Sequence, residues 1–128
     1  MDQKVLVGPD IQAGRDFLEL LESAGVPVTA ALWMRDGTPK DWQFHLITPW
    51  VDRYGVRQTF RKISAILSKA SPPPAIDLLD VYIYAEKSSH LDLLRKEFRR
   101  ARDQVFHNQR IDSGYDSGYG SGYIYAVK

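Results

Sequence analysis

The sequence predicts a single α+β domain in which three helices pack on a sheet of about five strands, with a mixed α/β arrangement as the alternative. Three observations support this prediction. The chain has 128 residues, which is the length of one ordinary domain. Its 44% hydrophobic and 26% charged residues are typical of a globular chain. Helical and strand periodicities follow one another in the order α-β-β-α-β-α-β-β across residues 1–128.

The first part of the chain predicts a helix over residues 10–24. Asp10 is a favourable N-cap, because its carboxylate can accept backbone N–H groups of the first helical turn. Apolar residues then recur at helical spacing until Gly25 and Pro27, which favour a helix end. Before this helix, the Val-Leu-Val sequence of residues 5–7 indicates a short additional strand.

The next two segments predict a β-hairpin. Residues 28–35 and residues 42–48 each show the period-two alternation of a strand. Between them, residues 36–41 contain the Asp, Gly and Pro that are typical of turns. Pro49 favours the end of the second strand.

The second half of the chain predicts two helices and three strands. A stripe of apolar residues indicates a helix over residues 56–70, before three consecutive prolines at residues 72–74. Residues 79–86 alternate as a strand, and a capping box of Ser89 and Asp92 opens a helix to about residue 101. Strands are predicted over residues 104–111 and 123–127. The Ser-Gly-Tyr repeats predict a mobile connection at residues 113–122, because glycine carries high backbone entropy.

The charges are unevenly distributed along the chain although the net charge is +1. Residues 1–52 carry four Lys/Arg and eight Asp/Glu, whereas residues 53–128 carry thirteen and eight. Residues 53–76 contain no acidic residue, and their basic side chains predict a weak nucleic-acid interaction of the second helix. The residues for this interaction are Arg57, Arg61, Lys62 and Lys69. The nearly neutral total charge argues against it, since solvated helix faces often carry such runs.

Several classes of site have no support in the sequence. The chain has no cysteine, which excludes a disulfide framework, a cysteine zinc site and a thiol nucleophile. Phosphate-binding glycine loops and a His-Glu-x-x-His motif are absent, so we predict no cofactor, no metal and no catalytic residue. The sequence also lacks an apolar run long enough for a membrane span or a signal peptide, which predicts a cytoplasmic protein.

One face of the predicted sheet is rich in aromatic and polar side chains. If helices cover the face with Leu32, Phe44, Val81 and Ile83, strand alternation places a second set on the opposite face. Tyr, Trp and Arg are enriched at interaction surfaces, because they join a large contact area to a polar tip. A second helical layer that buries these residues is the equally open alternative. The predicted binding residues are Trp33, Arg35, Gln43, His45, Tyr82, Tyr84 and Tyr125, with Asp80 and Glu86 beside them.

Residues 26–50 also resemble small uncharacterised bacterial α+β proteins of unknown function. The resemblance rests on the Ala-Ala-Leu-Trp sequence of residues 30–33 and the Leu-Ile-Thr-Pro sequence of residues 46–49. It contains no functional motif and implies no activity.

Three functional hypotheses follow from the sequence. The first is a non-enzymatic binding or protein-interaction domain that uses the aromatic-polar face for an unknown protein, a small-molecule ligand or a second copy in a homodimer. The second is an enzyme centred on His45 and Arg35. The third is nucleic-acid binding through the basic helix. An interaction face would be flat and partly apolar, whereas an active site would be a concave pocket with convergent polar groups.

Overall fold

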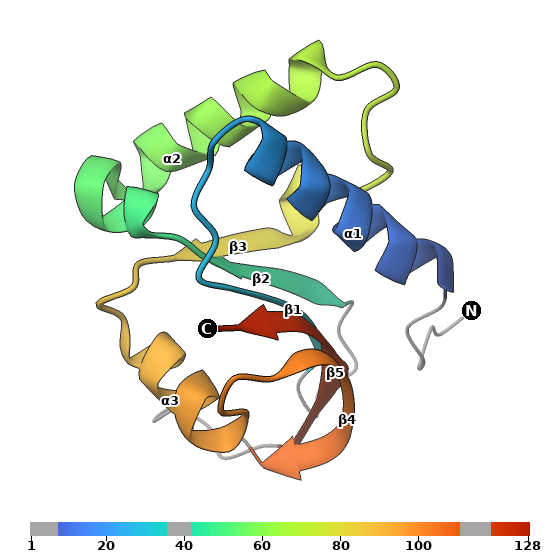
Figure 1. Ribbon diagram of the computed structural model, residues 1–128, viewed down its shortest axis with the longest axis vertical. Helices are drawn as coiled ribbons and strands as arrows, with labels where there is room; N and C mark the ends of the chain where they lie inside the picture. Colours follow the sequence, from blue (N-terminus) through green and yellow to red (C-terminus); the bar gives the residue numbers. More distant parts are fainter. Residues whose placement is uncertain (1–7, 36–41, 111–118) are drawn as a thin grey trace.

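The computed structural model describes residues 8–35, 42–110 and 119–128, which form three α-helices and a five-stranded mixed sheet (Figure 1). The elements are α1 (Gly8–Ser23), β1 (Ala30–Arg35), β2 (Gln43–Ile47), α2 (Pro49–Lys69), β3 (Val81–Tyr84), α3 (Ser89–Glu97), β4 (Arg102–Arg110) and β5 (Tyr119–Val127). The α+β class and the order α-β-β-α-β-α-β-β are confirmed. The proposed strand at residues 5–7 and the turn at residues 36–41 lie outside the described residues.

The strands lie in the order β3-β2-β1-β5-β4. β1 pairs with β2 and with β5 in antiparallel orientation, which confirms the predicted hairpin. β4 and β5 are also antiparallel, whereas β3 is parallel to β2. The parallel pair follows from the connection through α2, because a helical crossover returns the chain in the same direction.

Helices cover both faces of the sheet. Figure 1 shows α1 and α2 on one side and α3 on the other. Phe17 of α1 and Ile63 of α2 belong to the first core cluster, together with Phe44 of β2. Leu91 and Leu94 of α3 belong to the second cluster. The sheet is therefore the middle layer of three, and each helical layer has its own apolar core.

The two faces are composed differently from the prediction. Leu32 pairs with His45 and Trp33 pairs with Phe44, so Leu32 and Phe44 point to opposite faces. The prediction that Leu32 and Phe44 share a face is wrong. Alternation within a strand gives the period of two but not the register between strands, and β1 is apolar on both faces.

Several helix boundaries also differ from the prediction. α1 begins at Gly8, so Asp10 lies in its first turn and is not its cap. α2 begins at Pro49, seven residues before its predicted start, and the side chain of Thr48 accepts a hydrogen bond from Trp50 N at 3.2 Å. Gly55 interrupts this helix with φ 84°, a conformation that favours glycine. The predicted end at residue 70 is nearly right.

In the second half of the chain, the element boundaries also differ from those predicted. Residues 78–80 form a 3₁₀ turn, so the strand predicted over residues 79–86 is reduced to β3. α3 is capped at Ser88 without a side-chain hydrogen bond, which contradicts the capping box of Ser89 and Asp92. α3 also ends earlier than predicted, at Glu97. Residues 119–122 belong to β5, so this part of the predicted connection is a strand, and residues 113–118 lie outside the described residues.

Candidate functional site

The residues of the predicted aromatic-polar face are divided between the two faces of the sheet. Trp33 and Tyr125 lie in the core beneath α1 and α2, each with only 5% of its surface exposed. His45 lies on the opposite face, because its partner Leu32 packs in the α3 core. An open aromatic face is therefore wrong, and the alternative of a second helical layer is what the structure shows. The predicted homodimer loses the exposed patch that motivated it.

The geometry also argues against the second hypothesis, an enzyme centred on His45 and Arg35. Arg35 follows Trp33 by two residues on β1 and so shares the α1 and α2 face, whereas His45 points toward α3. A single reaction centre cannot include both side chains. Asp80 lies in the 3₁₀ turn, and Glu86 follows β3, where its carboxylate accepts a hydrogen bond from the hydroxyl of Thr29.

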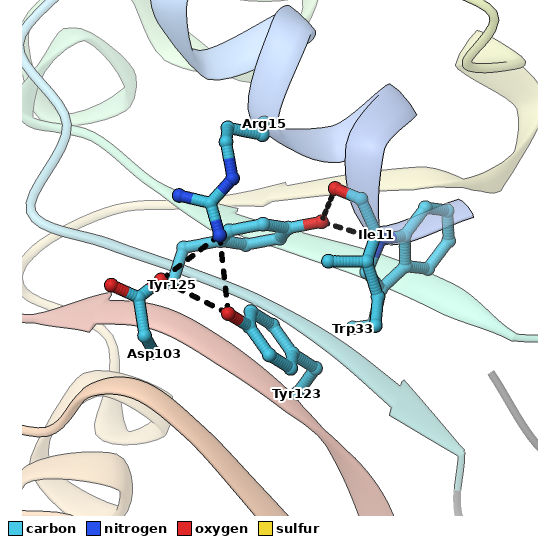
Figure 2. A network of polar contacts seen from close by, with 6 residues as sticks. All are labelled: Ile11, Arg15, Trp33, Asp103, Tyr123 and Tyr125. Atoms are coloured by element: carbon cyan, nitrogen blue, oxygen red, sulfur yellow. Dashed lines mark hydrogen bonds and ion pairs between the residues drawn. The ribbon is translucent and has the colours of Figure 1, made fainter. Parts of the chain in front are cut away.

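Trp33 and Tyr125 instead form the buried half of a polar network that joins α1 to the sheet (Figure 2). The Tyr125 hydroxyl donates to the carbonyl oxygen of Ile11 at 2.6 Å and accepts from Trp33 Nε1 at 3.0 Å. Trp33 Nε1 is also 3.2 Å from the carbonyl oxygen of Asp10. Burial raises the pKa of Tyr125 above its usual range, so the phenol stays protonated. These bonds hold the first turn of α1 on the sheet.

The exposed half of the network is a triangle of Arg15, Asp103 and Tyr123 (Figure 2). Arg15 Nη2 is 3.1 Å from both Asp103 Oδ1 and the Tyr123 hydroxyl, and this hydroxyl donates to Asp103 Oδ1 at 3.0 Å. The hydrogen bond from Arg15 lowers the pKa of Asp103. Arg15 and Asp103 side chains are 40% and 46% exposed, so this ion pair contributes less than about 1 kcal/mol. Each of the three polar groups is hydrogen-bonded to the other two, so together they link α1, β4 and β5.

On the α3 face, four rings form a cluster that we call the aromatic corner: His45, Tyr82, Tyr84 and His90. The His45 ring lies 5.9 Å from Tyr82, 5.3 Å from Tyr84 and 5.0 Å from His90. Tyr84 and His90 are 4.5 Å apart. The exposed member is Tyr82, with 44% of its surface accessible.

Hydrogen bonds fix the orientation of the histidines in the aromatic corner. His45 Nε2 is 3.0 Å from the amide oxygen of Gln43, so this nitrogen must carry a proton. In neutral His45 the other nitrogen, Nδ1, then accepts from His90 Nε2 at 2.9 Å. Burial lowers the pKa of His90 and favours this neutral pair. Burial likewise raises the pKa of Tyr84.

A concentration of positive charge lies at the C-terminal end of α3. A hollow of about 520 Å³, which we call the cationic hollow, has five basic side chains and one acidic side chain in its wall. Among the residues that the structure describes, none of the five cations forms an ion pair with an Asp or Glu side chain. The wall is formed by Asp92, Arg95, Lys96, Arg99, Arg100 and Lys128.

The helix dipole explains only part of this charge. Arg95 and Lys96 lie in the last turn of α3, where cations interact favourably with the helix C-terminus. Arg99 and Arg100 lie beyond the helix, and Lys128 follows β5. Arg95 Nε donates to the backbone oxygen of Lys128 at 2.9 Å, which brings the end of α3 to the end of β5. The cationic hollow is thus assembled by the fold from distant parts of the sequence.

The basic residues predicted on the second helix are exposed as well. Arg57, Arg61, Lys62 and Lys69 all lie on the accessible surface of α2. The Lys62 ammonium lies 4.6 Å from the ring centre of Tyr54, so part of its charge interacts with that ring. The sequence prediction missed the cationic hollow, although five of the residues 95–102 are basic. The acids nearby in the sequence concealed the signal, and Lys128 joins only through the fold.

A scan against protein-family models and searches of curated proteins and solved structures find no match to this chain. The resemblance of residues 26–50 to small bacterial proteins therefore stays a prediction. In the described ranges, no three His, Asp or Glu side chains are grouped so that they could hold a metal ion. None of the helices in these ranges has the length and apolar character that a membrane crossing requires.

Proposed function

We propose that this domain is a non-enzymatic binding module that holds a multiply charged anionic partner in the cationic hollow. The observation that carries the proposal is the set of five cations around one hollow that form no ion pair with an Asp or Glu side chain among the described residues. Like charges around one hollow repel each other, and an anion that enters it relieves that repulsion. Guanidinium and ammonium groups form strong charge-assisted hydrogen bonds to phosphate and carboxylate oxygens.

The number of cations favours a ligand with several negative charges. Five cations and Asp92 give the wall a net charge of +4, and one phosphate carries about two negative charges at neutral pH, so it would neutralise only about half of that charge. Five of the six lining side chains are arginine or lysine, which offer only N–H donors to an anion, and this suits binding more than catalysis. This proposal keeps the binding function that the sequence predicts and moves it from the sheet to the end of α3. The cytoplasm is its proposed compartment, because a chain without cysteine needs no oxidising environment.

Two double variants with the same change in charge test the location of the site. Lys96→Gln/Arg99→Gln removes two exposed cations of the cationic hollow, and Arg57→Gln/Arg61→Gln removes two exposed cations of α2. Inorganic polyphosphate is the probe, and its affinity is measured by calorimetry over a range of salt concentrations. We expect the hollow variant to bind at least about tenfold more weakly, since each lost charged contact costs roughly 1.5 kcal/mol or more. The α2 variant should stay within about twofold of the wild type.

The thermal stability of the same proteins separates binding from folding. Removal of unneutralised cations should leave the unfolding temperature of the hollow variant unchanged or raise it. Equal loss of affinity in both variants would refute the hollow as the site, and a larger loss in the α2 variant would favour the basic helix. If the wild-type protein does not bind polyphosphate at low salt, the proposed function is wrong.

A further inference from the structure

We infer that the anionic partner is a single-stranded nucleic acid, with its phosphates in the cationic hollow and a base stacked on Tyr82. This inference rests on the proposed function and adds the identity of the ligand class. Proteins that bind single strands without sequence preference combine a basic groove for the backbone with aromatic side chains for the bases. The cationic hollow and the aromatic corner supply these two components.

The helix α3 connects the two components. His90, the second residue of α3, contacts Tyr84 and His45 in the aromatic corner. Lys96, near the other end of α3, lines the cationic hollow. With a rise of about 1.5 Å per residue, His90 and Lys96 are only about 9 Å apart along the helix axis. Tyr82 lies beyond His90, next to the His45 ring, so an oligonucleotide of several nucleotides can contact both components at once.

The two components also lie on the same side of the sheet. Tyr82 is the register partner of His45, which points toward the α3 layer, so Tyr82 points that way as well. Figure 1 shows α3 on this side of the sheet, near the C-terminal end of β5, and the segment that precedes it comes from the edge strand β3. A strand that leaves the hollow along α3 toward β3 would meet the Tyr82 ring without crossing the sheet.

The ring of Tyr82 is accessible and lies beside the buried ring of His45. It is 44% exposed at the edge strand β3, and the His45 ring supports it from the protein side at 5.9 Å. His45 itself is fixed between Gln43 and His90 by hydrogen bonds of 3.0 Å and 2.9 Å.

The same geometry predicts a preference for single strands. In a duplex both faces of each internal base are already stacked, so a surface tyrosine has no free base to contact. An unpaired base exposes its face at little cost, and every base type offers such a face. An acidic polypeptide could satisfy the cationic hollow but would gain nothing specific from Tyr82.

A comparison of probes with and without bases tests this inference. The probes are a fluorescein-labelled oligothymidylate of about twelve nucleotides, an abasic strand of the same length, the matching duplex and polyglutamate. For the wild-type protein, fluorescence anisotropy should show oligothymidylate binding about tenfold more tightly than the abasic strand, which corresponds to one stacked base. The duplex and polyglutamate should bind more weakly than oligothymidylate.

Variants at one position assign the effect of the bases. Tyr82→Leu removes the ring and should abolish the preference, so that oligothymidylate and the abasic strand bind with about equal affinity. Tyr82→Phe keeps the ring and should retain the preference. Lys96→Gln/Arg99→Gln should weaken both probes by the same factor, since both carry the same phosphates. A stability measurement on each variant confirms that it is folded at the assay temperature.

The possible outcomes separate this inference from the proposed function. If the wild type binds both strands equally, or if Tyr82→Leu keeps the preference, the base contact is wrong and anion binding stands. Polyglutamate that binds as tightly as oligothymidylate would also overturn the inference in favour of an acidic protein partner. If none of the probes, including polyphosphate, binds at low salt, both proposals fail.

Discussion

Gly14 lies where α1 touches the sheet, and its substitution by alanine provides a sharp test of the packing. In an ordinary helix interior this change stabilises by about 1 kcal/mol, because alanine has the higher helix propensity. At this position a Cβ atom would lie 2.2 Å from the Tyr125 hydroxyl oxygen and 2.9 Å from Trp33 Nε1. The hydroxyl cannot yield freely, since it is held by its bonds to Ile11 and Trp33.

The balance of these terms gives the sign of the effect. Moving the hydroxyl away breaks two buried hydrogen bonds of about 1 kcal/mol each, and overpacking adds about 1–3 kcal/mol. After the gain in propensity, Gly14→Ala should reduce the free energy of unfolding by about 2–4 kcal/mol. Urea denaturation followed by tryptophan fluorescence measures this change.

A double-mutant cycle tests the mechanism. Tyr125→Phe removes the oxygen that the new methyl group would meet, so Gly14→Ala should be at least about 1 kcal/mol less destabilising in that background. An equal cost in both backgrounds would show that the hydroxyl is not the obstacle. If Gly14→Ala stabilises the wild type, the close packing of α1 on Tyr125 is wrong.

Three further predictions concern the connections around α3. Asp52 accepts hydrogen bonds at 2.8 Å and 3.1 Å from two backbone N–H groups between β3 and α3, so Asp52→Ala should cost about 1–2 kcal/mol in urea denaturation. An effect below about 0.3 kcal/mol would contradict this link. Burial lowers the pKa of His90 below its ordinary 6.5, so the unfolded chain binds more protons and stability should fall as the pH drops below about 6.5. His90→Gln should flatten that part of the pH profile, and an unchanged slope would exclude His90 as its cause. Arg100 has φ 51°, a conformation that costs a non-glycine residue about 1 kcal/mol or more. Arg100→Gly should therefore keep or raise the unfolding temperature while it weakens polyphosphate binding, and a large destabilisation would assign this arginine a structural role.

The order of the elements could be predicted because its signals are local. Alternation over residues 28–35 and 42–48, with turn residues between them, was enough to predict the β1–β2 hairpin. The start of α2 was missed because Pro49 also favours the end of a strand. In the structure it is the first residue of α2, where proline is favourable because its missing N–H has no helical partner.

The arrangement of the faces could not be predicted from the same patterns. Trp33 and His45 each fit an alternating strand, but only the register between β1 and β2 shows that they point in opposite directions. The cationic hollow could not be predicted for the same reason, because Arg99 and Lys128 are brought together only by the tertiary structure. Of the predicted binding residues, Tyr82 alone kept the combination of an aromatic ring and a largely accessible surface.

The central position of β5 has a consequence for how the chain folds. β5 lies between β1 and β4, and its pairing with β1 joins residues about 90 positions apart in the sequence, such as Leu32 and Ile124. Loops that close over such separations lose much chain entropy before they gain contacts, which slows folding. Before β5 pairs with β1, β1 has an open edge, and the apolar side chains of α3 have only part of the sheet surface on which they pack. During synthesis, the sheet therefore cannot close until β5 has been made, and in that interval the open edge of β1 is the part most exposed to wrong pairing.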